Sequence, residues 1–385
     1  MKREDVVFFR TRKLENLDFF SNSPPQVFIG SKLYPRANIG VLSPSEPIDR
    51  VQLLYAPNKW TELGLSIKEI LGLRNQLINS RFQVSSMKEN TMFLDRAREV
   101  GMAYKPTDLE IHLKKIPKYQ RENDKIIVPI SLTAPLKTFK LTENPKIHTK
   151  VDKVVDDIDL KAKDALMYLY KNDFNEHFLQ QLLSIGVLGL KKNRRLVPTR
   201  FSITATDDTI GMELLKEIRD YPAIEDYRLF YDEYLGNHYF ILLLPTLFGY
   251  ELFEYGTRYG KITGEWTDFE DYFGRKNYAS SSVGGYYSVR LSVLEYLKKI
   301  KRQASVFIIR YETEKYWANL GVWCTRNCAR RAMNNKYISF YSRENALDFM
   351  KNFIFNRMKQ DTSPIMKKSK LLNQVREQKA LKEFF

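Results

Sequence analysis

The chain has 385 residues, of which 43% are hydrophobic and 13% aromatic, so it is long enough for two packed subdomains and too apolar for a disordered protein. Its 62 lysines and arginines outnumber its 46 aspartates and glutamates, and the formal net charge of +16 favours a polyanionic partner such as a nucleic acid. The sequence has neither a run of about 18 apolar residues nor the apolar core of a signal peptide, so we expect a soluble cytoplasmic protein without a membrane contact.

The first third of the chain predicts an α+β subdomain over residues 1–135. A short strand is expected at Val27-Phe28-Ile29, and a helix capped by Ser66 is expected over residues 66–80. A second helix over residues 88–100 and an alternating strand over residues 108–114 follow. Residues 136–159 are charged and weakly patterned, so we interpret them as a linker.

A second α+β subdomain is predicted over residues 160–359. Its first helices form a hairpin, and the alternation of Thr199, Phe201, Ile203 and Ala205 predicts a strand over residues 196–208. A helix capped by Asp207 and Asp208 is expected next. Mixed helices and strands without regular βαβ alternation favour an α+β fold with mixed or antiparallel sheets. The remaining expected elements are an antiparallel meander over residues 227–235, 239–244 and 247–255, a strand over residues 305–311, and helices over residues 287–302, 322–333 and 343–357.

The junction between the expected strand and helix is the strongest internal candidate for catalysis. Arg200 lies on the strand, and Asp207 and Asp208 stand at the helix start. Two carboxylates there would suit Mg²⁺ and phosphoryl chemistry, and they are also what a helix N-terminus prefers for capping alone. Four further acidic residues would complete such a metal site if the fold brought them to Asp207 and Asp208: Glu254, Glu265, Asp268 and Asp271.

Two other segments are candidates for phosphate or nucleic-acid contacts. Gly284 and Gly285 precede a helix whose first turn carries Arg290, so backbone amides there would approach a phosphate, although the spacing of a P-loop is lacking. Arg326 and Arg330 form an i,i+4 basic stripe near Trp317 and Trp323. That stripe is typical of a nucleic-acid grip and equally of a solvated helix face.

The two cysteines, Cys324 and Cys328, are too few for a structural zinc site and have poor geometry for a helical disulfide. We therefore expect small buried core residues in a reducing compartment. The four histidines have no ligand spacing, so no metal site is predicted from them.

The last segment of the sequence carries the most specific pattern. Gln378, Leu381 and the pair Phe384-Phe385 have the spacing of a sliding-clamp-binding peptide, in which one short helical turn presents the apolar side chains to a pocket on a ring-shaped partner. Residues 360–385 are rich in lysine and arginine, so we expect a flexible basic tail that presents the peptide at residues 378–385. The alternative is that these apolar residues anchor the tail on the protein's own core.

Several segments together resemble the archaeal Nre family of DNA-repair proteins. The resemblance spans nearly the whole chain and implies DNA-damage repair, docking on the sliding clamp PCNA through the C-terminal peptide, and association with the nucleoid. Many relatives carry a cysteine-rich zinc module near the N-terminus, which this chain lacks because no cysteine precedes Cys324. The matching segments are residues 25–30 with Tyr34-Pro35, residues 134–137, 197–205 and 284–287 with Arg290, residues 294–297, residues 321–323 with Arg326, and the terminal peptide.

The leading hypothesis is thus a DNA-repair factor that PCNA recruits and whose basic body binds DNA or other repair proteins. One alternative is a metal-dependent nuclease or nucleotide-processing enzyme that uses Asp207 and Asp208. Another is a clamp-associated scaffold that does not bind DNA. The resemblance implies no catalytic mechanism.

Overall fold

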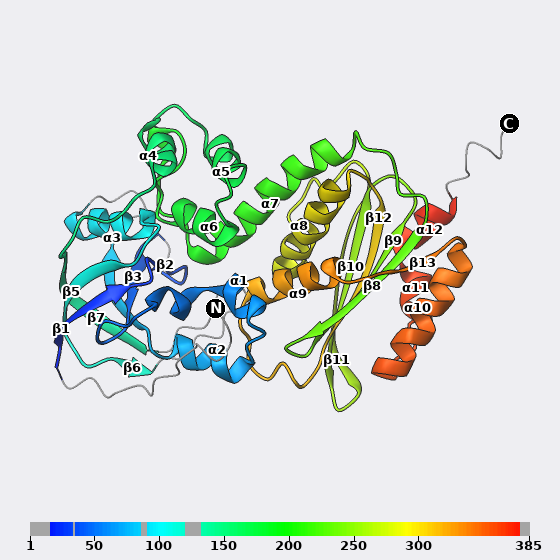
Figure 1. The fold of residues 1–385 in the computed structure, drawn as a ribbon, viewed down its shortest axis with the longest axis horizontal. Coiled ribbons are helices and arrows are strands. Elements are labelled where there is room, and N and C mark those ends of the chain that lie inside the picture. The colour runs from blue at the N-terminus through cyan, green and yellow to red at the C-terminus, as the bar shows by residue number, and fades with distance from the viewer. Residues whose placement is uncertain (1–15, 34, 86–90, 120–131, 378–385) are drawn as a thin grey trace. The chain divides into compact units, whose positions relative to one another are not determined.

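The computed structural model describes residues 16–33, 35–85, 91–119 and 132–377 and divides into two compact units (Figure 1). Unit 1 holds residues 1–210 and 319–323, and unit 2 holds residues 211–318 and 324–385. The division falls inside helices α7 (Thr199–Ile218) and α9 (Val322–Asn334). The expected linker at residues 136–159 instead holds most of strand β7 (Leu132–Leu141) and helix α4 (Thr149–Asp156), because their apolar positions are buried.

Unit 1 is built on a mixed sheet whose described strands lie in the order β1-β5-β7-β4-β3-β2, with β6 paired to β7. Only β4 and β7 pair in parallel, and the other neighbours are antiparallel. The expected strands at residues 27–29 and 108–114 are confirmed within one residue. The remaining strands are β1 (Asp18–Ser23), β2 (Val27–Ile29), β3 (Ala37–Ser43), β4 (Ile78–Val84), β5 (Thr107–Leu113) and β6 (Lys118–Tyr119).

The helices of unit 1 begin largely where capping residues predict. The Ser66 hydroxyl accepts a hydrogen bond from the Glu69 amide, and the Glu69 carboxylate accepts one from the Ser66 amide, which completes a capping box. That helix ends at Arg74, earlier than expected, because the following residues enter β4. The helices are η2 (Val51–Tyr55), α1 (Pro57–Glu62), α2 (Ile67–Arg74), α3 (Met92–Met102), α5 (Ala162–Tyr170), α6 (Glu176–Ser184) and η3 (Lys191–Asn193).

The strand predicted over residues 196–208 is wrong, because α7 begins at Thr199. The carbonyl of Pro198 accepts hydrogen bonds from the amides of Phe201 and Ser202, which starts the helix. Phe201 is 52% exposed, whereas Ile203 and Ile210 are buried, so the buried positions follow helical spacing. The β-branched residues of this segment have strand propensity, and packing overrides it.

Unit 2 is a sheet with helices on both faces. Its described strands lie in the order β11-β10-β12-β9-β8-β13, and only β10 and β12 pair in parallel. The expected antiparallel meander therefore holds for β8 and β9 but not for β10, because the connection through α8 inserts β12 between β9 and β10. The strands are β8 (Tyr227–Tyr234), β9 (Asn237–Leu244), β10 (Gly249–Arg258), β11 (Lys261–Glu270), β12 (Ser305–Glu312) and β13 (Ile338–Phe340).

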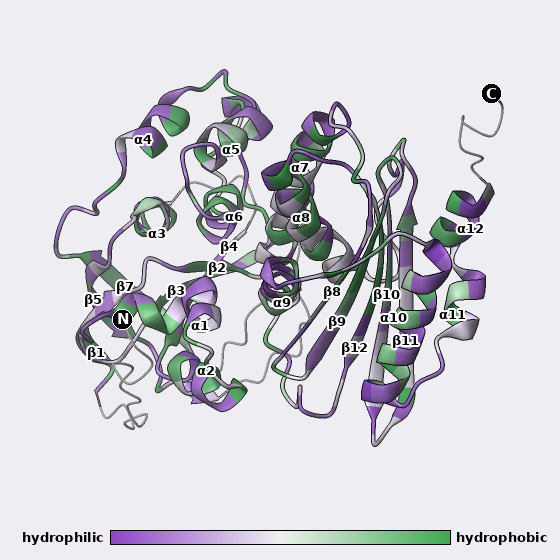
Figure 2. Cartoon of the chain, turned by 45° about the vertical axis from the view of Figure 1, so that its right-hand side comes forward, coloured by the Kyte–Doolittle hydropathy of each residue, from purple (hydrophilic) through white to green (hydrophobic). Residues whose placement is uncertain are grey.

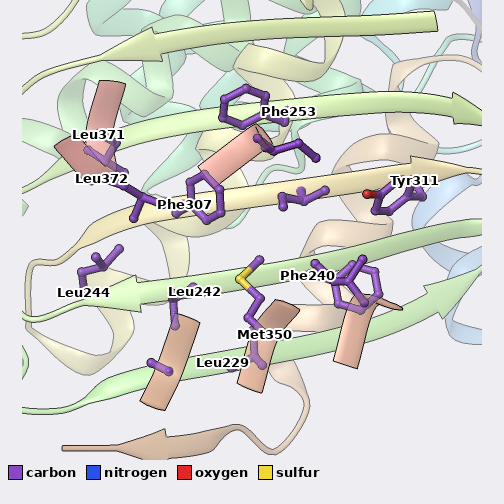
Figure 3. Close-up of a cluster of buried hydrophobic side chains, with 14 of the residues drawn as sticks. Leu229, Phe240, Leu242, Leu244, Phe253, Phe307, Tyr311, Met350, Leu371 and Leu372 are labelled. Carbon is purple, nitrogen blue, oxygen red and sulfur yellow. The ribbon is translucent and has the colours of Figure 1, made fainter. Parts of the chain in front are cut away.

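Helices α8 (Val283–Ile300) and α9 cover one face of this sheet, and three C-terminal helices cover the other (Figure 1). Hydrophobic residues are concentrated in the central strands (Figure 2). Against the second face, the strands present apolar side chains that include Phe240, Leu242 and Phe307, and Met350 of α10 packs on them (Figure 3). The three helices are α10 (Arg343–Met358), α11 (Ser363–Lys368) and α12 (Lys370–Glu377).

The chain from residue 360 to residue 377 is folded, in contrast to the expected flexible tail. Leu371 and Leu372 of α12 are at most 2% exposed and complete the core under this face (Figure 3). The Glu251 carboxylate of β10 accepts hydrogen bonds from the Ser369 hydroxyl and from the amides of Lys370 and Leu371, the two amides at 3.1 Å. Burial raises the pKa of Glu251, and the three donors oppose that rise. A buried carboxylate thus caps α12 and docks it on the sheet.

We predict that Glu251→Ala lowers the free energy of unfolding by about 2–3 kcal/mol, because three donors at the start of α12 lose their acceptor. The measurement is urea denaturation of the full chain. Glu265→Ala is the matched control. The side chains of its ion pair are 40% exposed for Glu265 and 46% exposed for Lys368, so we expect the pair to contribute less than about 1 kcal/mol. Equal losses in the two variants would contradict the capping role.

Candidate functional site

Two of the segments that carry the family resemblance meet at an edge of the unit 1 sheet. Among the described strands β2 pairs with β3 alone, so the amides along its other side need acceptors from elsewhere. The Val27 amide donates to Gln181 Oε1 at 3.1 Å, and the Ile29 amide donates to Thr199 Oγ1 at 2.9 Å. Side chains of α6 and α7 thereby accept the hydrogen bonds that a further strand would accept. Residues 25–30 and 197–205 are therefore in direct contact.

A third segment joins the same place through apolar packing. Ile203 and Val322 are both buried and Phe28 packs against them. Trp323 is 3% exposed, its indole N–H donates to the Leu320 carbonyl at 2.6 Å, and its ring lies edge-on to Trp60 at 5.4 Å. Trp323 is therefore a core residue of unit 1 and does not present its ring for base stacking.

Between these elements lies a cavity of about 30 Å³ lined by both polar and apolar side chains. That volume holds about one water molecule and no larger ligand. The lining residues are Gln26, Val27, Phe28, Leu42, Tyr55, His177, Gln180, Gln181, Ser184, Thr199 and Ile203.

Asp207 and Asp208 lie in the interior of α7 and not at a helix start, so the predicted capping role is wrong. Asp207 is 1% exposed, and Gln180 Nε2 donates to its Oδ1 at 3.1 Å. Arg200 lies in the first turn of α7, with its guanidinium 5.5 Å from the Phe201 ring centroid. Two helical turns of about 5 Å each separate it from Asp207. Within residues 16–33, 35–85, 91–119 and 132–377, no three His, Cys, Asp or Glu side chains gather as a metal site.

In unit 2, Gly285, one of the two glycines considered for phosphate binding, faces a carboxylate. A Cβ at Gly285 would lie 2.5 Å from Glu254 Oε1, so Glu254 fills the space beside the first turn of α8, where the helix dipole favours negative charge. Arg310 Nη1 donates to Glu254 Oε1 at 2.6 Å. Burial raises the pKa of Glu254, and Arg310 opposes that rise. Gly285 therefore makes room for Glu254 of the protein itself.

The arginines considered for nucleic-acid contact are held within unit 2. Arg290 is 1% exposed, and its Nε donates to Glu270 Oε1 at 2.8 Å. Arg326 is fully buried. Arg330 is partly buried and donates from Nε and Nη2 to the two oxygens of Glu295, each at 2.8 Å. In this conformation Arg290 and Arg326 are inaccessible to a phosphate backbone.

The acidic residues considered alongside Asp207 each have a separate structural partner. Asp268 is 5% exposed, accepts from Arg275 Nη1 at 2.7 Å, and accepts from the amides of Ser281 and Ser282 at 3.1 and 2.7 Å. Asp271 accepts from the Phe273 amide at 2.9 Å. Arg275 was not singled out in the sequence analysis. Its partner Asp268 lies on β11, and the polar composition of that strand does not indicate that the Asp268 side chain is buried.

The two cysteines are buried as expected, with 3.8 Å between the sulfur atoms. Burial and the neighbouring thiol of Cys324 raise the pKa of Cys328, which keeps that thiol protonated. The clamp-binding residues Gln378, Leu381, Phe384 and Phe385 lie outside the described residues.

We predict that Gly285→Ala destabilises unit 2 by about 1–3 kcal/mol, because the added methyl group would collide with the Glu254 carboxylate. Urea denaturation measures the loss, and the double variant Gly285→Ala/Glu254→Asp, whose shorter side chain makes room, should recover part of it. If Gly285→Ala weakens DNA retention at unchanged stability, the glycine serves a phosphate and not the carboxylate.

Within the described part of the chain, no helix is both long and apolar enough to cross a membrane. No solved structure matches the chain significantly. Three curated relatives do. The DNA repair protein NreA of Archaeoglobus fulgidus is 38% identical over 333 residues, which is 84% of this chain and 82% of the relative. NreA of Haloferax volcanii is 32% identical over 81% of this chain and 77% of its own length, and the DNA repair protein NreB of A. fulgidus is 33% identical over 86% and 84%.

The family models cover nearly the whole chain. Residues 2–259 match the N-terminal model of archaeal Nre proteins, and residues 270–384 match the C-terminal model. The segments at residues 25–30 and 197–205, which the β2 edge brings together, lie within the first match. The chain belongs to the archaeal Nre family.

Proposed function

We propose that this protein is a DNA-repair factor that docks on the PCNA sliding clamp through Gln378, Leu381, Phe384 and Phe385. The observation that carries the proposal is the spacing of these four residues in a chain whose relatives are named DNA repair proteins. Leu381 and the aromatic pair would fill an apolar pocket on the clamp, and the Gln378 amide would bond to backbone at its rim. A short peptide of this kind binds with micromolar affinity, on the order of 8 kcal/mol.

The way the chain reaches this peptide supports the proposal. Helix α12 ends at Glu377, and Leu371 and Leu372 already complete the core under α10–α12. Glu251 fixes the start of the same helix. The described core under α10–α12 is built from residues upstream of the peptide, and in this proposal the apolar side chains of the peptide serve a partner.

The basic body would supply DNA affinity. With a formal charge of +16, the protein gains free energy when its cations displace the counterions of a phosphate backbone. This term is independent of base sequence, which suits a factor that acts wherever the clamp encounters damage. The peptide would then bring the protein to its place of action, and the body would contact the DNA there.

We predict that Phe384→Ala/Phe385→Ala abolishes detectable clamp binding in calorimetry and leaves the melting temperature unchanged. The change removes both aromatic anchors from the pocket, while the described core is closed by other residues. Lys379→Ala/Lys382→Ala is the matched control, since it alters the same segment between the motif positions and should keep affinity within a few-fold. Clamp affinity that survives loss of the two aromatics would refute the docking mode.

We also predict that DNA retention by the full chain falls steeply as salt rises, because each phosphate contact releases counterions. Binding of a labelled oligonucleotide between 50 and 200 mM salt, roughly the range over which such contacts weaken strongly, measures the slope. No retention at the lowest salt would leave a clamp-associated protein scaffold as the function.

A further inference from the structure

The loop between β11 and α8, residues 271–282, is crossed by a set of hydrogen bonds, some of them buried. Asp268 binds its end through the amides of Ser281 and Ser282, and Arg275 binds its middle by donating to Asp268 and to the carbonyl of Tyr278. The Tyr287 hydroxyl accepts from the Ala279 amide at 2.9 Å. These hydrogen bonds tie the middle and the end of the loop to β11 and α8.

The same loop exposes aromatic side chains. Phe273 is 87% exposed and Tyr278 is 56% exposed. Phe273 lies on a tight turn in which the Gly274 amide donates to the Asp271 carbonyl at 3.0 Å, and Gly274 has the positive φ of 86° that favours glycine. The Phe273 ring packs edge-on to the Tyr272 ring, with 5.6 Å between the centroids, and leaves most of its surface open to solvent, so a partner that covers it would gain the free energy of burying that surface.

Basic side chains lie at the root of this loop. Arg219 Nη2 donates to the Tyr272 carbonyl, and its guanidinium lies 5.1 Å from the Tyr272 ring centroid. Gln303 Nε2 donates to the carbonyls of Arg219 and Tyr221 at 3.1 and 2.6 Å. Gln303 follows the end of α8, where four of five consecutive residues are basic: Lys298, Lys299, Lys301 and Arg302.

We propose that this surface binds single-stranded DNA, with the Phe273 ring stacked on a base and Lys276, Lys299, Lys301 and Arg302 on the phosphates. Lys298 and Arg219 instead have partners within unit 2, the Glu217 carboxylate at 2.9 Å and the Tyr272 carbonyl. The inference rests on the proposed DNA-binding function and gives it a place in unit 2. An exposed aromatic ring beside cations matches the two parts of a single strand, its base faces and its charged backbone. A duplex keeps its bases stacked on each other, so only a single strand offers a base to Phe273.

The first test measures the affinity of the full chain for a fluorescently labelled oligothymidine by anisotropy. Phe273→Ala should weaken binding by about 5- to 100-fold, the usual range for one lost base–aromatic stack, at an unchanged melting temperature. The control is Tyr341→Ala: Tyr341 is 94% exposed and follows β13, which forms the opposite edge of the sheet from β11. This control should keep affinity within about two-fold.

The second test separates stacking from charge. Lys299→Gln/Lys301→Gln should make the dependence of log affinity on log salt shallower by about 0.7 for each lost phosphate contact, whereas Phe273→Ala should leave the slope unchanged. Lys336→Gln is the charge control: it removes one charge from an exposed lysine five positions before Tyr341, and its effect is compared with that of the double variant per charge removed.

Three outcomes would overturn the inference. Equal effects of Phe273→Ala and Tyr341→Ala on affinity would show that no base stacks on Phe273 and that DNA binds elsewhere on the basic body. An equal loss of affinity for duplex and single strand in Phe273→Ala would refute base stacking. Absence of any DNA retention by the wild-type protein would refute both this inference and the DNA-binding part of the proposed function, whereas clamp binding would stand by its own test.

Discussion

Unit 2 depends on two buried carboxylates of one strand. Glu251 and Glu254 are three residues apart on β10, so their side chains point to opposite faces of the sheet. Glu254 meets Arg310 and the first turn of α8, and Glu251 meets the first turn of α12. Burying a carboxylate costs several kcal/mol unless donors compensate, so each helix layer must keep its position to satisfy the charge beneath it.

This arrangement accounts for most of the chemistry-bearing residues that the sequence offers. Asp268, Glu270 and Arg290 hold loops and helices against the sheet, and Asp207 pairs with Gln180 in unit 1. Side chains that resemble metal ligands or phosphate clamps in the sequence are therefore mainly internal supports. The proposed roles fall on other residues: the terminal peptide, which lies outside the described residues, and the exposed side chains of the loop at residues 271–282.

Local patterns predicted the fold where a segment's neighbours in sequence decide its structure. The Ser66 capping box and the α+β character follow from short-range spacing. The prediction for segment 199–208 failed because its alternating apolar positions imitate a strand, whereas the positions that are buried, among them Ile203, Asp207 and Ile210, recur at helical spacing and depend on packing partners outside the segment. Glu251 was not singled out because its partners lie about 120 residues away, a separation that no local pattern encodes.

The fixed helix α12 sets a length scale for any complex formed by the terminal peptide. Glu377 is the last described residue of α12, and the peptide begins at the next position, Gln378. Eight residues span at most about 28 Å even when fully extended. A partner that binds this peptide would hold unit 2 within that radius. The local concentration of unit 2 around the partner would then be on the order of 10 mM. Contacts of the body that are too weak to form a complex in an untethered protein would then be sufficient to form one.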